Sequence, residues 1–237
     1  MMLYLCKVNY FLYLCTQIYE MTMNHDLPQS VPQGSYGAMP KEGCPIEIFA
    51  AELRRRIKEG SGNASENFRD VSSVNPQDEA LIAEDLARTE GMWMDFSEIA
   101  NLGTPFPNGV ENDVYLNSNG NLIYKVNNLM TSKTLLALFD RLILHNSLFP
   151  QTGYKLKGFT GFGNGSIYPI LSQDFIPNER EATPIEIDMY MAALGFQKIS
   201  DAKYSNETIE VSDLHPRNVL RDKDGDLYVV DAEIKRL

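Results

Sequence analysis

The sequence predicts an α+β fold in which short helices precede an antiparallel sheet. The clearest observation is an Asn-Gly pair at 119–120 between two β-type runs, 113–117 and 122–127, because this pair favours the tight turn of a hairpin. A second observation is the helical spacing of apolar residues in 45–58 and 131–147. The third is size and composition: 237 residues, 43% of them hydrophobic, can bury one sizeable core with a small addition.

The first 44 residues (1–44) are predicted to contribute little to the function. Residues 1–19 are apolar, but polar residues interrupt them, and the run is too short for a transmembrane helix. A signal peptide is an alternative, although no small-residue cleavage site follows. A translation start placed too early is the simpler interpretation, because two more methionines follow within 20–23. Residues 24–43 are rich in Pro, Gln, Gly and Ser, which indicates an unstructured leader.

A short segment and a larger domain are predicted after this leader. The segment, 45–74, consists of the helix 45–58 and a linker rich in Gly, Ser and Asn. Asn75 has the residue type of a helix cap, and Pro76 suits the first helical position. We therefore expect a second helix to open a domain of residues 75–237.

Beyond the hairpin, the patterning predicts further helices and strands. Thr183 and Glu186 form a capping box, which marks the start of a helix that ends near Gly195. The other predicted elements are the helix 131–147, strands at 154–159 and 166–175 joined by a Gly-rich turn at 160–165, a strand at 208–211, and a hairpin of residue 220 with 227–230.

Charge and cysteine content exclude several classes of protein. The net charge of −11 argues against binding to nucleic-acid phosphates or to an anionic membrane. The three cysteines form no CxxC pair and no disulfide framework, so a reducing cytoplasm is expected. The histidines and cysteines show no spacing typical of a zinc site.

Three oxygen-bearing side chains near the C-terminus have the spacing that phosphoryl transfer from ATP requires. Asp213 is followed five residues later by Asn218, and Asp231 comes thirteen residues after that, behind an apolar strand. One carboxylate, Asp213, can orient an attacking hydroxyl, while Asn218 and Asp231 can hold Mg²⁺ against the phosphates. His215, within the same segment, is expected to hold the loop by hydrogen bonds rather than to act as the base.

Upstream residues supply the other parts of a nucleotide site. Gly109 and Val114 lie in a turn that could cover the phosphates and the adenine, although an ordinary surface turn is the alternative. Lys125 lies within a half-buried strand, where it needs an anion unless it protects the edge of a sheet. Gln173 and Phe175 follow an apolar strand, and their order in the chain makes this segment the predicted hinge that reads the adenine.

These segments together resemble those of the protein-kinase-like superfamily. Residues 213–220, DLHPRNVL, are similar to its catalytic loop, in particular the form found in aminoglycoside phosphotransferase-like kinases. More narrowly, the chain resembles the serine/threonine/tyrosine-kinase-like domain found in polyvalent proteins of bacterial phages and conjugative elements. The residues that carry this resemblance are 109–116, 124–126, 145–150, 173–175, 213–220 and 231–233.

The resemblance implies a two-lobe fold that uses ATP and Mg²⁺. The N-lobe, with an antiparallel sheet, would span about 96–175 and a reduced C-lobe about 176–237, because the sequence ends six residues after Asp231. Lys125 would match the lysine that steadies the α- and β-phosphates. Gly109, Val114, Gln173 and Phe175 would contact the nucleotide.

Several residues depart from the pattern of the superfamily. Val211 stands where a histidine usually precedes the catalytic acid, and Glu233 stands where a glycine usually follows the metal-binding one. The helix 131–147 contains no glutamate to pair with Lys125, and Asp140 is its only acid.

We therefore expect an ATP- and Mg²⁺-dependent phosphotransferase that acts on a protein hydroxyl. A pseudokinase that binds a nucleotide or a partner without chemistry is one alternative. A kinase acting on a small molecule is the other.

Overall fold

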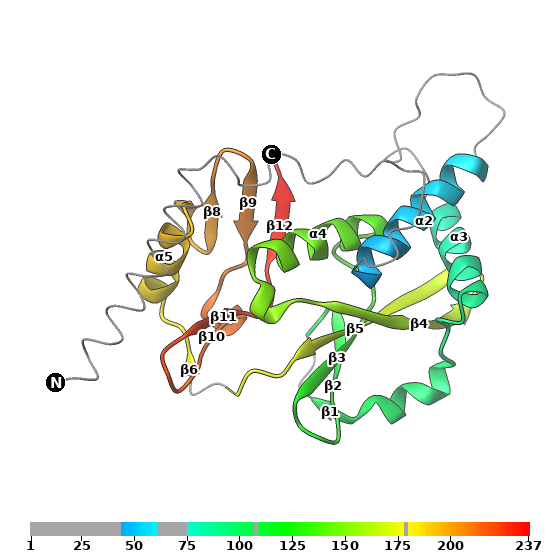
Figure 1. Ribbon diagram of the computed structural model, residues 1–237, viewed down its shortest axis with the longest axis horizontal. Helices are drawn as coiled ribbons and strands as arrows, with labels where there is room; N and C mark the ends of the chain where they lie inside the picture. Colours follow the sequence, from blue (N-terminus) through cyan, green and yellow to red (C-terminus); the bar gives the residue numbers. More distant parts are fainter. Residues whose placement is uncertain (1–43, 61–74, 107–108, 178–179) are drawn as a thin grey trace.

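The N-terminal half of the described chain forms one five-stranded antiparallel sheet. The computed structural model describes residues 44–60, 75–106, 109–177 and 180–237 (Figure 1). The strand order is β1-β2-β3-β5-β4, so β3 is the central strand. The strands are β1 (Thr104–Phe106), β2 (Asn112–Leu116), β3 (Leu122–Asn127), β4 (Lys155–Gly163) and β5 (Ser166–Asp174).

Three helices pack against this sheet and form a hydrophobic core with it. They are α2 (Pro45–Gly60), α3 (Pro76–Thr89) and α4 (Leu135–Leu148) (Figure 1). Phe49 of α2 lies between Phe139 of α4 and Phe159 of β4, with ring centroids 5.9 and 4.4 Å away. All three phenylalanines are buried, so the apolar face predicted for the first helix does meet the sheet and α4.

Helix α4 begins later than its apolar pattern predicts. It starts at Leu135 rather than Thr131, and Thr134 caps it by accepting from the Ala137 amide. A second cap comes from α3, because the buried Glu79 carboxylate accepts from the Leu135 and Leu136 amides at 2.6 and 3.2 Å. The start of α4 is thus set by a residue 56 positions away.

The C-terminal part has a second hydrophobic core and two small sheets. One sheet has the order β11-β10-β6 and the other β12-β9-β8-β7. Helix α5 (Pro184–Ala193), opened by the capping box of Thr183 and Glu186, packs on them through Ile187 and Met191. The strands are β6 (Arg180–Glu181), β7 (Gln197–Ser200), β8 (Lys203–Ser205), β9 (Ile209–Ser212), β10 (Val219–Arg221), β11 (Leu227–Val229) and β12 (Glu233–Arg236).

Three short 3₁₀ segments complete the described elements: η2 (Phe96–Leu102), η3 (Pro150–Thr152) and η4 (Pro216–Asn218). The mixture of helices and antiparallel sheets confirms the predicted α+β class. The turn predicted at 160–165 is shorter than expected, because β4 continues to Gly163. The predicted leader and most of the linker, 1–43 and 61–74, lie outside the described residues.

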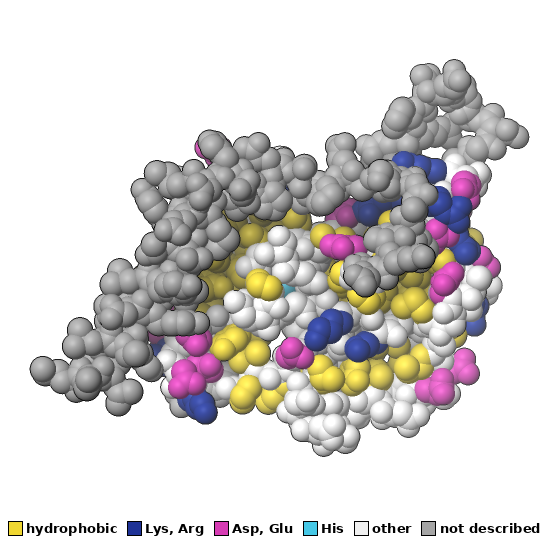
Figure 2. All heavy atoms as spheres, viewed as in Figure 1, with side chains coloured by type: hydrophobic (Ala, Val, Ile, Leu, Met, Phe, Trp, Pro, Cys, Tyr) yellow, Lys and Arg dark blue, Asp and Glu magenta, His cyan; other side chains and the backbone are white. Residues whose placement is uncertain are grey.

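The described surface carries its basic residues among acidic ones. On α2, Arg55 pairs with Glu52 and Glu59, and Arg56 pairs with Glu52 and Asp85. The basic side chains over α2 accordingly lie beside acidic ones on the face shown in Figure 2. Among the described residues, no helix is both long and apolar enough to cross a membrane.

Candidate functional site

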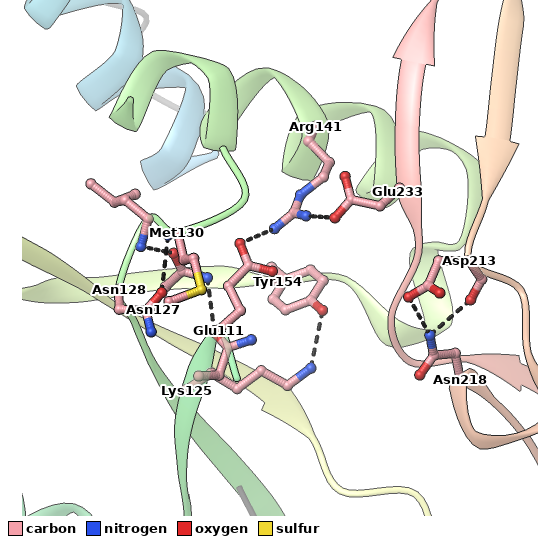
Figure 3. Close-up of polar contacts among 12 residues, drawn as sticks. Glu111, Lys125, Asn127, Asn128, Met130, Arg141, Tyr154, Asp213, Asn218 and Glu233 are labelled. Atoms are coloured by element: carbon pink, nitrogen blue, oxygen red, sulfur yellow. Dashed lines mark hydrogen bonds and ion pairs between the residues drawn. The ribbon is translucent and has the colours of Figure 1, made fainter. Parts of the chain in front are cut away.

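Lys125 lies in the middle of the five-stranded sheet. Its strand, β3, is paired on both sides, so the alternative of a lysine that protects a sheet edge is wrong. The side chain is buried, and its ammonium donates to the Tyr154 hydroxyl at 3.0 Å (Figure 3). It also donates to the Val230 carbonyl at 3.2 Å. The second contact joins the sheet to the residue immediately before Asp231.

The Val230 carbonyl accepts hydrogen bonds from three buried side chains. Besides Lys125, it accepts from the Tyr154 hydroxyl at 3.0 Å and from the Gln173 amide nitrogen at 3.2 Å. Three donors on one buried carbonyl hold the local backbone in place. The backbone that leads into Asp231 is therefore held from the side of the sheet.

The protonation states of this cluster follow from burial and charge. Burial alone would lower the pKa of Lys125, but Tyr154 and the Asp231 carboxylate outweigh it and raise that pKa above its usual value. Burial raises the pKa of Tyr154 to about 12, and Asp231 adds to this rise. At neutral pH the lysine is thus an ammonium, and the tyrosine is a neutral phenol that can both accept and donate.

Asp213 has an unusual backbone conformation. Its φ of +62° is in the left-handed region, which aspartate adopts more readily than most residues but still at some cost. Two backbone hydrogen bonds hold the loop after Asp213: the Leu214 amide donates to the Ala202 carbonyl at 3.1 Å, and the His215 amide donates to the Asp213 carbonyl at 2.9 Å. His215 Nε2 also lies 3.3 Å from an Asp213 carboxylate oxygen, in agreement with a loop-holding role.

Asn218 is bonded directly to Asp213. Its side-chain nitrogen Nδ2 donates to the Asp213 carbonyl at 2.8 Å and to the carboxylate Oδ2 at 2.9 Å (Figure 3). With Nδ2 bonded in this way, the amide oxygen Oδ1 of Asn218 is the atom available to a cation. Within the described chain, no residue donates a hydrogen bond to that oxygen.

Strand pairing brings the segments of all three oxygen-bearing residues together. β9, which leads into Asp213, pairs with β12, which follows Asp231, and Ser212 lies opposite Glu233. β10, which follows Asn218, pairs with β11, and the Val230 amide donates to the Asn218 carbonyl at 2.9 Å. The segments 213–218 and 230–232 therefore face each other between two pairs of strands.

Asn218 and Asp231, the two predicted metal ligands, have oxygen-bearing side chains of the kind that Mg²⁺ takes. No group of three His, Cys, Asp or Glu side chains in the described residues could hold a metal ion. Mg²⁺ keeps several waters and commonly takes one or two carboxylates with phosphate oxygens. One amide oxygen from Asn218 and the half-buried Asp231 carboxylate meet that requirement.

The predicted nucleotide contacts are placed around the same sheet. Val114 of β2 lies opposite Lys125, whereas Gly109 is exposed and has open space where a Cβ would lie. The Gln173 side chain is turned inward and donates to the Thr152 carbonyl at 2.6 Å, so only its backbone could read an adenine. The Phe175 amide donates to the Asn121 carbonyl at 2.9 Å, which leaves the carbonyl of Phe175 for such a contact.

Sequence reasoning missed a buried arginine that contacts two site segments. Arg141 of α4 donates to Glu111, in the turn before β2, at 3.1 Å, and to Glu233, the first residue of β12 (Figure 3). Asp140, the acid considered for Lys125, instead pairs with Arg54 of α2. The only sequence signal was an arginine among the apolar residues of the helix 131–147.

His145, also in α4, is buried beside this cluster. Its Nε2 lies 3.2 Å from the Thr152 carbonyl, while Nδ1 is buried without a hydrogen-bond partner in the described residues. Burial and then the charge of Lys125 lower the pKa of His145 to about 4. The ring is therefore neutral near pH 7.

We expect this buried imidazole to make the fold less stable in mild acid. The folded chain resists the proton that the unfolded chain accepts below its pKa of about 6.5, so stability is lost as the pH falls from there toward 4. Between pH 7 and pH 5, the free energy of unfolding of the native protein should fall by roughly 2 kcal/mol more than that of His145→Gln, as measured by urea unfolding. Parallel pH profiles of the two proteins would contradict the buried neutral imidazole.

Comparison with known proteins identifies the family of the chain. A model of the family described as a serine/threonine/tyrosine kinase found in polyvalent proteins matches residues 76–236. This span covers more than half of the chain and includes every site residue discussed above. A comparison with curated proteins finds no match. The chain therefore belongs to the family of serine/threonine/tyrosine kinases found in polyvalent proteins.

Proposed function

We propose that the protein transfers the terminal phosphoryl group of ATP, with Mg²⁺, to a hydroxyl group of a protein. The family supports a kinase-like phosphotransferase. The observation that carries the finer proposal is the contact of the Lys125 ammonium with the Val230 carbonyl, next to Asp231. This contact holds the Lys125 ammonium beside the backbone that leads into Asp231, which supports a site where the ammonium meets the phosphates and the half-buried carboxylate meets the cation.

Each residue has a distinct role in this proposal. Lys125 binds the α- and β-phosphates, and the Asn218 oxygen and the Asp231 carboxylate hold the metal. Asp213 accepts a hydrogen bond from the acceptor hydroxyl and orients it, while the Asn218 nitrogen keeps the Asp213 carboxylate in place. Mg²⁺, when bound, supplies charge neutralisation of the phosphates. Gly109 and Val114 cover the nucleotide, and the backbone of the segment containing Gln173 and Phe175 reads the adenine.

A nucleotide-binding module without catalysis is the second candidate. It is favoured by the way in which Lys125 is already bound to a phenol and a carbonyl, since a phosphate would have to draw the ammonium away from these partners. The same residues would then bind ATP but turn over little of it. The two candidates differ in ADP formation and agree in binding.

ATP binding with and without Mg²⁺ tests both candidates. In Lys125→Met, which keeps the length of the side chain, we expect ATP affinity to fall roughly 10- to 150-fold, because one charge-assisted contact contributes roughly 1.5–3 kcal/mol. In Asp231→Asn, the gain in affinity that Mg²⁺ gives the native protein should disappear. Isothermal titration calorimetry measures both quantities.

Two exposed residues on neighbouring elements provide the matched controls. Lys157, on β4, and Asp226, before β11, are exposed, so Lys157→Met and Asp226→Asn should bind like the native protein. A native protein that binds no ATP at any Mg²⁺ concentration would overturn the proposed function and its alternative together.

A further inference from the structure

Arg141 joins helix α4 to the two segments that carry the candidate site. One partner, Glu111, lies within the turn 109–114 that is proposed to cover the nucleotide, and the other, Glu233, lies two residues after Asp231. The arginine is only 8% exposed, and both Leu138, one turn before it, and Leu142, next in the sequence, are buried in the core. A guanidinium in such a place must have acids beside it, and its planar fork can serve two at once.

Both partners are themselves anchored to the site. The Glu111 carbonyl accepts from the Asn128 amide at 3.0 Å, and the Asn128 side chain donates to the Val110 carbonyl at 2.8 Å, so the turn is tied to the end of β3. Glu233 is paired to Ser212, directly before Asp213. A displacement of either glutamate would therefore move the covering turn or the acid loop with it.

Asp231 lies between two fixed points of its own backbone. The Val230 carbonyl on one side is held by three side chains of the sheet, and Glu233 on the other side is held by Arg141 (Figure 3). Burial lowers the pKa of Arg141, but Glu111, Glu233 and then the Asp231 carboxylate outweigh it and raise that pKa above its usual value. The position of the Asp231 carboxylate thus depends on the anchor at Glu233 as well as on the one at Val230.

Stability alone gives no reason for a buried arginine at this position. A buried ion pair is often no more stabilising than well-packed apolar residues of the same volume. Its effect is on geometry, because it holds three segments at fixed separations. Helix α4 has no glutamate to pair with Lys125, and Lys125 donates to Tyr154 instead. The contact of α4 with the site is therefore made by Arg141, through the glutamates that it binds.

We propose that Arg141 is a positioning residue that holds the metal carboxylate Asp231 and the nucleotide-covering turn in register, by binding Glu233 and Glu111 at the same time. The proposal rests on the proposed function. Residues that orient metal ligands from behind affect metal affinity more than nucleotide affinity in the absence of metal. This difference separates positioning from a general contribution to the fold.

The test is Arg141→Lys, which keeps the charge but cannot fork to two acids. We expect the Mg²⁺ concentration for half-maximal ATP binding to rise about tenfold or more, as for other residues that support metal ligands. ATP affinity without Mg²⁺ should change far less than the Mg²⁺ dependence, because the loss of the metal ligand's support does not act on it. Calorimetric titrations at a series of Mg²⁺ concentrations give both values, and circular dichroism confirms that the variant is folded.

Arg54→Lys is the matched control, because Arg54 also joins two elements by an ion pair, to Asp140 of α4, away from the site. It should leave the Mg²⁺ dependence unchanged. If Arg141→Lys does not fold, the triple variant Arg141→Met, Glu111→Gln, Glu233→Gln takes its place, because it leaves no charge at any of the three positions. We expect the same rise in the Mg²⁺ concentration for half-maximal ATP binding.

The outcomes distinguish this inference from the proposed function. If the ATP affinity of the native protein does not depend on Mg²⁺, both the proposed function and the positioning role are overturned. A native protein that responds to Mg²⁺, together with an Arg141→Lys variant that responds at the same concentration, overturns the positioning role alone. A lower melting temperature with an unchanged Mg²⁺ response also overturns only the positioning role, since it makes Arg141 a purely structural residue.

Discussion

Replacing Asp213 by Asn should lower the rate of ADP formation by about 10²- to 10⁴-fold, the range that a positioned acid or base contributes. The variant keeps the size of the side chain and an oxygen that can accept from Asn218, but it loses the carboxylate that orients the hydroxyl. Asparagine also tolerates the left-handed backbone at φ +62°, where alanine would add strain of its own. The loss should therefore report on the chemistry rather than on the loop.

The affinity for ATP and Mg²⁺ should remain within a few-fold of native, because Asp213 is proposed to contact neither. Asp201→Asn is the matched control, as Asp201 is a fully exposed acid next to Ala202, the residue that holds the Asp213 loop. Equal rates of ADP formation in native protein and Asp213→Asn would remove Asp213 from the catalytic role. Binding without any turnover in the native protein would favour the nucleotide-binding module.

The contacts that sequence reasoning anticipated are local ones. Asp213 and Asn218 are five residues apart, and a short 3₁₀ segment between them is enough to bring the amide to the carboxylate. The hairpin of β2 and β3 follows from its Asn-Gly turn, and α5 follows from its capping box. In each case the chemistry that specifies the structure lies within a few residues.

The contacts that were missed join residues far apart in the chain. Lys125 and Tyr154 are separated by 29 residues, and Arg141 and Glu233 by 92, so no local pattern specifies either pair. The hairpin of β7 and β8 was missed for another reason. All four residues of β7 are exposed, so it shows no alternation of apolar and polar side chains.

Helix α2 lies outside the residues that the family model matches, but it belongs to the same hydrophobic core. The match begins at residue 76, yet Ile46, Phe49 and Leu53 of α2 are buried in the same core as α4 and β4. The apolar face of this helix was visible in the sequence, but its partner was not. The structure shows that its partners include α4, the helix that carries Arg141 and His145.

We therefore expect Phe49→Ala to destabilise the protein by about 3–5 kcal/mol in urea unfolding, as for other buried phenylalanines. The ring is 4% exposed and contacts both Phe139 and Phe159, so its removal leaves a cavity between α4 and the sheet. Arg55→Ala on the exposed face of the same helix should change the free energy of unfolding far less, because it removes only surface ion pairs. Similar losses in the two variants would mean that α2 is not part of the core. A large loss confined to Phe49→Ala would show that the helix outside the family match helps to hold α4, and with it the arginine proposed to orient the site.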